Sequence, residues 1–309
     1  MPSNKLALLF PGQGAHCHNM LDAYIGTREF DELYPVICNA VGYAPLQSIG
    51  DDPSLINTNL LSSILTVLAS CLAWKRFNEE SKAIPDAVAG YSVGQLTALH
   101  VAGCFDFPEL AQLVALRARL MDDCFRSSAG AMLAVIGLPQ KTLEDICCRL
   151  QSEGHSVWIS NFNCLGQYSL SGTREAITAA QTLAAEQKPK KLLELPVSGA
   201  WHSPLLKQCQ PSFGDHLKNH HWHSPRIPVI DNVTGDFLPD DAELIKEQLV
   251  KHLTHPVRWE TGIKTLISQG YAQFIEIGYG NVLTKFGFFL DRTATFESFC
   301  GDTRTVCVE

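Results

Sequence analysis

The sequence has no long hydrophobic run, no excess of positive charge and no Cys-x-x-Cys pair. No apolar segment approaches the roughly 18–20 residues that cross a bilayer, and the five apolar residues after Lys5 are too few for the core of a signal peptide. The 24 Lys and Arg residues are outnumbered by 32 Asp and Glu residues, which gives a net charge of -8. Nucleic-acid backbones require clustered positive charge. We therefore expect neither a membrane protein nor a nucleic-acid-binding protein.

The 11 cysteines are odd in number and contain no Cys-x-x-Cys pair. Secreted disulfide scaffolds are shorter, and their cysteines come in pairs. We therefore expect reduced thiols in a cytoplasmic protein. The length of 309 residues is enough for one large domain or two smaller ones.

Short apolar strands alternate with longer apolar helices through most of the chain. Leu6–Phe10 is a short apolar run that ends in Pro11-Gly-Gln-Gly14, and Asp86–Gly90 is a second such run. Helical patterns are expected over residues 53–78, from Gly94 to about Ala102, and from Pro108 to about Phe125. This order predicts an α/β fold.

The middle of the chain has a different pattern. Residues 132–197 predict the order β-α-β-β-α-β, with strands at 132–137, 157–161, 168–171 and 191–197 and helices at 141–153 and 174–186. This is the ferredoxin-like order. We predict a ferredoxin-like subdomain over 129–197, inserted into an α/β-hydrolase-like large domain formed by 1–128 and 198–309.

The most specific local motif is Gly90-Tyr-Ser92-Val-Gly94, placed between a predicted strand and a predicted helix. A sharp strand-to-helix turn exposes the serine hydroxyl, and the flanking glycines relieve crowding. The N–H of Val93 and the start of the helix would face an oxyanion formed by attack of Ser92 on a carbonyl. We interpret Ser92 as a nucleophile; a glycine-flanked turn with a capping serine is the alternative.

A serine nucleophile needs a base, and His202 is the best placed of the 11 histidines. It follows a predicted strand and Ser198-Gly199, and Ser203-Pro204 then begins a helix as cap and first residue. His216 and His220 have the i,i+4 spacing of a metal pair. No third ligand is apparent from the sequence, so we interpret them as a solvated helix end and predict no metal.

Arg117 lies in the middle of an apolar helical stripe that includes Leu113, Val114 and Met121. Burying an unpaired guanidinium is costly, and no acidic residue shares this face. A substrate carboxylate would fit as a bidentate partner. A distant structural salt bridge, or an arginine extending to solvent, is equally compatible with the pattern.

Together, these residues resemble the malonyl-CoA–acyl-carrier-protein transacylases and the related acyltransferases of polyketide synthesis. The resemblance covers nearly the whole chain. Besides the motif around Ser92, and Arg117 25 residues later, it rests on five further segments: Leu9–Gly14, Asn161–Gln167, Val197–Pro204, His255–Trp259 and Glu276–Gly280.

The resemblance implies a ping-pong transfer of a malonyl or related dicarboxylic acyl group from coenzyme A to the phosphopantetheine thiol of an acyl carrier protein. It makes Ser92 the acyl-accepting nucleophile and His202 its base. The backbone N–H groups of Gln13 and Val93 would form the oxyanion hole, and Arg117 would bind the acyl carboxylate. The family implies malonyl-CoA as substrate, the carrier protein as partner and no bound cofactor.

The resemblance also assigns secondary roles. Met121 and Asn163 match substrate-binding positions, and Trp201 stands where malonyl-specific members usually carry a bulky Phe. Unsubstituted malonyl is therefore expected over methylmalonyl. His252 stands where a glutamine usually supplies a main-chain carbonyl to the catalytic histidine, and a backbone contact can survive that change. Tyr91 replaces the usual histidine before the nucleophile.

Other functions remain open at this point. An acyl hydrolase of the same fold would clear carrier-bound chains, but Arg117 would then have no carboxylate to pair with. The transacylase component of a malonate decarboxylase is a second alternative. An ordinary esterase would need an acidic triad member between Ser92 and His202 and a His-Gly-Gly loop, and neither is convincingly present. A non-catalytic carrier-binding module would be expected to have lost one of Ser92, His202 and Arg117.

Overall fold

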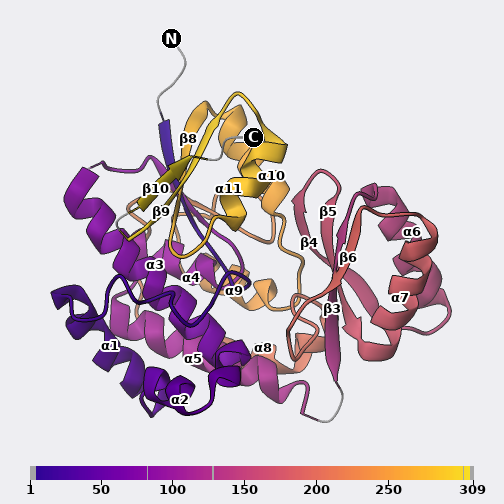
Figure 1. Ribbon diagram of the computed structural model, residues 1–309, viewed down its shortest axis with the longest axis horizontal. Coiled ribbons are helices and arrows are strands. Elements are labelled where there is room, and N and C mark those ends of the chain that lie inside the picture. The colour runs from indigo at the N-terminus through magenta and orange to yellow at the C-terminus, as the bar shows by residue number, and fades with distance from the viewer. Residues whose placement is uncertain (1–4, 82, 127–128, 302, 307–309) are drawn as a thin grey trace.

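The computed structural model describes residues 5–81, 83–126, 129–301 and 303–306 (Figure 1). Its larger unit is built on a six-stranded sheet with the order β10-β9-β8-β1-β2-β7. Neighbouring strands are parallel except β10, which pairs antiparallel with β9. The strands are β1 (Lys5–Phe10), β2 (Ala87–Gly90), β7 (Val229–Ile230), β8 (Tyr271–Ile277), β9 (Thr295–Cys300) and β10 (Thr303–Val306).

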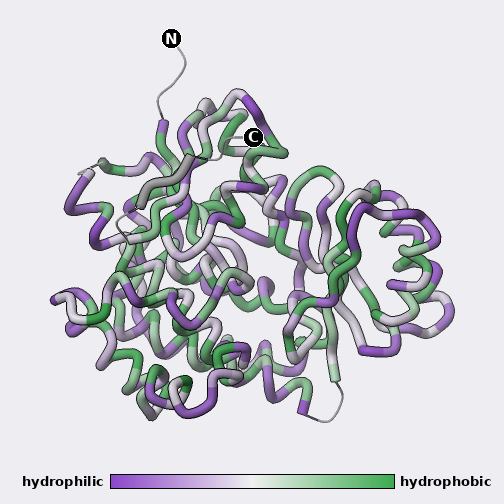
Figure 2. Tube along the Cα trace, viewed as in Figure 1, coloured by the Kyte–Doolittle hydropathy of each residue, from purple (hydrophilic) through white to green (hydrophobic). Residues whose placement is uncertain are grey.

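Helices cover both faces of this sheet. Leu8 and Phe10 of β1 pack into the larger core, whereas Ala7 and Leu9 point into the opposite one, as the two-residue period of a strand requires. Hydrophilic and hydrophobic segments alternate along the helices (Figure 2). The helices on the larger core are α1 (Arg28–Val41), α2 (Pro45–Asp51), α3 (Asn59–Ser81), α4 (Gly94–Val101), α5 (Phe107–Asp123), α8 (Gln210–Lys218) and α9 (Ala242–His252); α10 (Trp259–Ser268) and α11 (Val282–Leu290) contribute to the opposite core.

The smaller unit is a four-stranded antiparallel sheet with the order β4-β5-β3-β6. It comprises β3 (Gly130–Ile136), α6 (Gln140–Ser152), β4 (Val157–Cys164), β5 (Gln167–Thr173), α7 (Arg174–Glu186) and β6 (Lys191–Glu194). The sheet and its two helices enclose a separate hydrophobic core and lie beside the larger unit (Figure 1). The predicted α/β fold with a ferredoxin-like unit is confirmed; the boundaries 129–197, with 1–128 and 198–309 outside them, stay a prediction.

The two units are joined along β4. The N–H of Val257 donates to Ser160 O at 2.9 Å, and the N–H of Phe162 donates to Val257 O at 2.9 Å. The Tyr91 hydroxyl, next to the Gly90–Gly94 turn, receives a hydrogen bond from Asn161 Nδ2 at 2.8 Å and donates to Asn163 Oδ1 at 2.7 Å. The small sheet is thus hydrogen-bonded to the residue beside Ser92.

Two predicted elements have other bounds in the structure. The strand predicted to reach Val197 ends at Glu194, because Pro196 has no N–H to continue the ladder. The helix predicted over 53–78 is divided into a 3-10 turn, η1 (Pro53–Asn57), and α3.

One helix, α3, has the length and composition of a membrane span, with a mean hydropathy of 1.3 over its most apolar window. In the fold, 78% of that window is buried inside the protein. A buried core helix meets the same length and composition criteria as a membrane span. The helix α3 is therefore long and apolar enough for a membrane span, but it lies in the core of the protein.

Candidate active site

Ser92 lies at the sharp turn between β2 and α4, and its φ of 54° is in the left-handed region. The turn depends on its two glycines. A Cβ atom on Gly90 would lie 2.0 Å from Gly94 O, and one on Gly94 would lie 2.2 Å from Phe10 O. Side chains at these two positions are therefore excluded, and the turn has the strained strand-to-helix geometry that exposes a nucleophile.

His202 meets Ser92 across the top of the sheet. Its Nε2 is 2.7 Å from Ser92 Oγ, and its Nδ1 is 3.0 Å from the carbonyl oxygen of His252. The carbonyl can only accept, so Nδ1 carries the proton and Nε2 is left to accept the serine hydroxyl. The predicted pair and the predicted backbone contact of His252 are therefore brought together.

The surroundings of His202 keep its ring neutral. Burial, followed by the positive charge of Arg117, lowers the pKa of His202 to about 3. The ring of His252 lies 4.9 Å away between centroids, and burial also lowers its pKa well below the ordinary value. A neutral imidazole is the form that can take a proton from Ser92.

The loop that carries His202 differs from the prediction in one respect. His202 has a φ of 56°, and the following helix is a 3-10 turn, η2 (Pro204–Cys209), rather than an α-helix. Ser203 stands at the predicted N-cap position and Pro204 begins the turn, but the Ser203 hydroxyl donates to Ala200 O at 2.7 Å rather than to the turn. This bond closes the loop on itself and holds His202 in its left-handed conformation.

The Pro11–Gly14 loop lies against the Ser92 turn. A Cβ atom on Gly12 would lie 2.6 Å from Tyr91 O and 3.4 Å from Ser92 Cβ. Gln13, the next residue, is anchored through its side chain, which donates to Asn59 Oδ1 at 3.0 Å and to Ser62 Oγ at 2.6 Å.

The backbone N–H groups of Gln13 and Val93 donate to no acceptor within the described ranges. Unpaired donors beside a nucleophile are what a developing oxyanion requires. Val93 follows Ser92 directly, and Gln13 follows Gly12, which approaches Ser92; their role as an oxyanion hole stays a prediction.

Arg117 is buried on α5, with 3% of its surface exposed. Its Nη2 has no hydrogen-bond partner, and no acidic side chain of the described part of the chain forms an ion pair with it. Burial lowers the pKa of Arg117 to about 10, so the group is still cationic at neutral pH. A buried, unpaired cation that also lowers the pKa of His202 is a ready binding group for a carboxylate.

Met121 and Trp201 form the apolar surroundings. Met121 is buried on α5 one turn after Arg117, and Trp201 packs edge-on against Phe125 with ring centroids 5.5 Å apart. Trp201 lines a small cavity of about 110 Å³ together with Gln13. The substrate-binding roles of Met121 and Trp201 stay a prediction.

Asn163 is placed differently from a free substrate ligand. Its Oδ1 accepts the hydrogen bond of the Tyr91 hydroxyl, although Asn163 also lines a cavity of about 250 Å³ that reaches the Pro11–Ala15 loop. Its first function in the structure is to hold Tyr91.

Two buried amides that support the turn are absent from the sequence analysis. Asn232 Oδ1 accepts the N–H of Ser92 at 2.8 Å, and its Nδ2 donates to Gly90 O at 2.6 Å and to Gln95 Oε1. Gln95 in turn donates to Ile230 O at 3.0 Å. Asn232 is 140 residues from Ser92, and only its position two residues after the end of β7 could have indicated a role.

A cleft of about 750 Å³ opens on His202 between the two units. Its walls carry Trp158, Phe162 and Pro256, and the cations Lys207 and Lys251. An elongated ligand with an apolar arm and anionic groups fits this lining.

Comparisons with known proteins agree with this geometry. Residues 74–287 match the family described as the acyl transferase domain. The chain is 34% identical to the malonyl CoA-acyl carrier protein transacylase of Bacillus subtilis over 91% of this chain and 89% of the relative. It is 32% identical to the Staphylococcus aureus (strain MRSA252) protein of the same name, over 91% of each.

Two solved structures are similar over nearly their full length. One is an acyl-carrier-protein S-malonyltransferase from Burkholderia pseudomallei, with a TM-score of 0.90, 30% identity and 96% of each chain covered. The other is the holo complex PlMCAT:AntF, a type II PKS acyl-carrier protein with its malonyl-transacylase, with a TM-score of 0.90, 28% identity and 96% of each chain covered.

Proposed function

This chain belongs to the acyl transferase domain family, and on that premise we propose that Ser92 and His202 move a malonyl group from coenzyme A to the phosphopantetheine thiol of an acyl carrier protein. The observation that carries the proposal is the buried, unpaired Arg117 beside a hydrogen-bonded Ser–His pair. We propose that the malonyl carrier protein serves a polyketide or related assembly line. The expected location of this chain is the cytoplasm.

The first half-reaction transfers the acyl group to the protein. His202 Nε2 takes the proton of Ser92 Oγ while that oxygen attacks the thioester carbon. The carbonyl oxygen becomes an oxyanion that the N–H groups of Gln13 and Val93 stabilise. Collapse of this intermediate breaks the C–S bond, and the CoA sulfur leaves with the proton held by His202.

The second half-reaction runs the same steps in reverse. The thiol of the carrier protein enters the position that CoA has left, and His202 takes its proton. The thiolate attacks the acyl-serine ester, and Ser92 Oγ leaves with the proton from His202. Every proton transfer is made by this residue pair, so the chemistry needs no cofactor.

Arg117 selects an acyl group with a free carboxylate in two ways. The guanidinium offers paired donors to the carboxylate. In addition, its positive charge disfavours the imidazolium that forms on His202 during attack, because this charge is one of the two causes that lower the pKa of His202. A bound carboxylate neutralises that charge and makes His202 a stronger base. An acetyl group gains neither effect.

Trp201 and Met121 set the size of the acyl group. Both are buried beside Ser92's partners, and Trp201 is fixed by its contact with Phe125. A 2-methyl substituent would have to displace one of these side chains, and overpacking in a filled site costs typically 1–3 kcal/mol. We propose that unsubstituted malonyl is preferred over methylmalonyl.

The test follows both half-reactions separately. Release of CoA from malonyl-CoA reports acylation, and formation of malonyl carrier protein reports transfer. Rapid release of free malonate with no acylated carrier would indicate a hydrolase. Transfer only to a decarboxylase carrier subunit would indicate the malonate decarboxylase component.

A further inference from the structure

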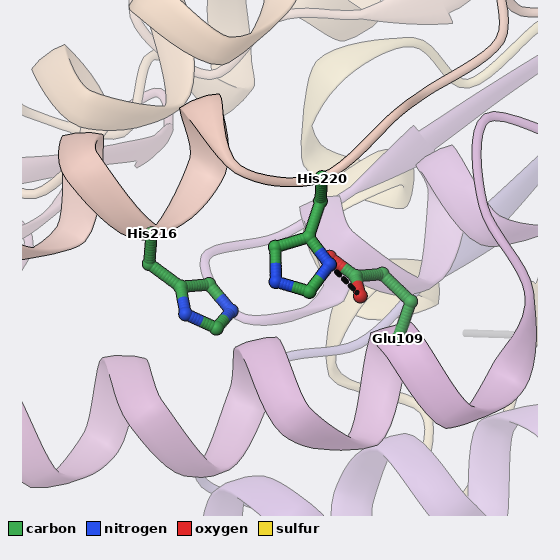
Figure 3. Close-up of side chains that lie close together, drawn as sticks. All are labelled: Glu109, His216 and His220. Atoms are coloured by element: carbon green, nitrogen blue, oxygen red, sulfur yellow. Dashed lines mark ion pairs between the residues drawn. The ribbon is translucent and has the colours of Figure 1, made fainter.

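Away from the Ser92 site, three metal-ligating side chains converge between α5 and the end of α8. Glu109 comes from the first turn of α5, His216 from α8 and His220 from just after α8. One ligand atom from each lies within 4.8 Å of the other two (Figure 3). The i,i+4 histidine pair is visible in the sequence, but Glu109 lies 107 residues before His216, so no local pattern joins it to the pair.

Part of this cluster is already paired. His220 Nδ1 is 2.6 Å from Glu109 Oε2, and the dashed line in Figure 3 marks this ion pair. The pair accounts for two of the three side chains without any ligand. It does not account for His216, which points at the other two.

His216 Nε2 is the unexplained atom. It is buried and has no hydrogen-bond partner, and the His216 ring lies tilted against that of His220, with centroids 4.4 Å apart. A buried nitrogen without a partner is costly unless something binds it.

The surrounding groups orient the three side chains and leave one side open. Trp222 Nε1 lies 3.5 Å from Glu109 Oε1, and Lys246 Nζ donates to His220 O at 2.7 Å. The charge of Lys246 is balanced by Glu243 at 2.8 Å. Glu109 and His220 also line a cleft of about 520 Å³, from which a water or a fourth ligand can reach the cluster.

We propose that Glu109, His216 and His220 form a binding site for one divalent transition-metal ion, and that this ion is Zn²⁺. Two imidazoles and one carboxylate are a zinc ligand set, whereas Mg²⁺ and Ca²⁺ select oxygen ligands. Ligand atoms of a tetrahedral zinc are about 3.4 Å apart. The three ligand atoms now lie within 4.8 Å of one another. Side-chain rotations that move each atom by on the order of 1 Å would therefore bring them to the zinc spacing.

A metal at this site would link two segments that matter for the active site. Helix α5 carries Arg117 eight residues after Glu109, about 12 Å along the helix, and α8 follows the loop of His202 through η2. The ion would hold these segments together without contacting the acyl group. Its expected effect is on stability rather than on the chemical step.

The experiment titrates Zn²⁺ into chelator-treated full-length protein and measures stoichiometry, affinity and the thermal midpoint. One equivalent should bind and raise the Tm. Co²⁺ should give the visible d–d absorption of a four-coordinate nitrogen–oxygen site.

His216→Ala is the decisive variant, because it leaves the Glu109–His220 ion pair intact. The Tm of the metal-free variant should equal that of the metal-free wild type. Its Zn²⁺ affinity should fall by at least about 10-fold, because removing even a residue that only supports a metal ligand weakens binding by that factor. His221→Ala is the matched control: His221 lines the same cleft but is outside the three. The proposal is overturned if no equivalent binds, if His216→Ala binds as the wild type does, or if His221→Ala weakens binding equally.

Discussion

Replacing Arg117 by alanine tests both effects that we assign to its charge. The variant removes a guanidinium that is 3% exposed and has no partner in the described part of the protein. Breaking a buried, charge-assisted pair by removing one partner costs roughly 2–5 kcal/mol. At 1.36 kcal/mol per tenfold, malonyl transfer should fall by roughly 30- to 5,000-fold in kcat/KM.

The same substitution should raise activity toward an acyl group that has no carboxylate. Removing the positive charge removes one of the two causes that lower the pKa of His202, so the base becomes stronger for acetyl-CoA. The ratio of the malonyl rate to the acetyl rate should therefore fall by a larger factor than the malonyl rate itself. Arg117→Lys is the matched control, since it keeps a charge but loses the bidentate geometry.

The assay measures CoA release from malonyl-CoA and from acetyl-CoA under single-turnover conditions. Circular dichroism should show an unchanged fold, because truncating Arg117 removes an unpaired charge rather than a structural ion pair. An unchanged ratio of the two rates in Arg117→Ala would refute the assignment. So would a loss of acetyl activity as large as the loss of malonyl activity.

Three further predictions address the base, the subdomain contact and the partner. His202→Ala should slow acylation by on the order of 10²–10⁴-fold. In the wild type, a base whose pKa is about 3 stays neutral, so kcat/KM should change less than about twofold from pH 7 to pH 5. A histidine of ordinary pKa 6.5 would lose about 25-fold over the same range. Tyr91→Phe should lower the free energy of unfolding by roughly 1–3 kcal/mol, because two buried amides lose the hydroxyl between them. Reversing the exposed Lys190 and Lys191 to glutamate should raise the KM for an acidic carrier protein and flatten its salt dependence, and leave acylation by malonyl-CoA unchanged.

Each of these predictions has a distinct contradicting outcome. More than about a tenth of the wild-type rate in His202→Ala, or an acid limb near pH 6.5, would require another base. Tyr91→Phe with wild-type stability, measured by urea unfolding, would show that the hydroxyl bridge contributes nothing. For Lys190 and Lys191, equal changes in the carrier and CoA half-reactions, or no change in either, would show that the carrier protein binds elsewhere on the surface.

Local features of the sequence were sufficient to predict the nucleophile turn and its base. The glycines around Ser92 and the loop of His202 determine their conformations within a few residues, so short-range rules apply to them. Arg117 was recognisable because helical periodicity places it on an apolar stripe. The small sheet could be predicted because its alternating elements are short and regular.

Contacts between distant segments were not predictable in the same way. Asn232 meets Ser92 across 140 residues, and Tyr91 meets Asn163 across 72. No local rule pairs such residues, since they meet only after the strands have assembled. The pairing of Glu109 with His220 was missed for the same reason.

The central claim is that Ser92 carries the malonyl group between the two substrates, and intact-mass spectrometry after mixing with malonyl-CoA tests it most directly. The wild type should gain the mass of one malonyl group, peptide mapping should place it on Ser92, and a holo carrier protein should then remove it. Ser92→Ala should gain no mass and support no transfer. An adduct that persists on Ser92→Ala, or that maps to another residue, would contradict the account.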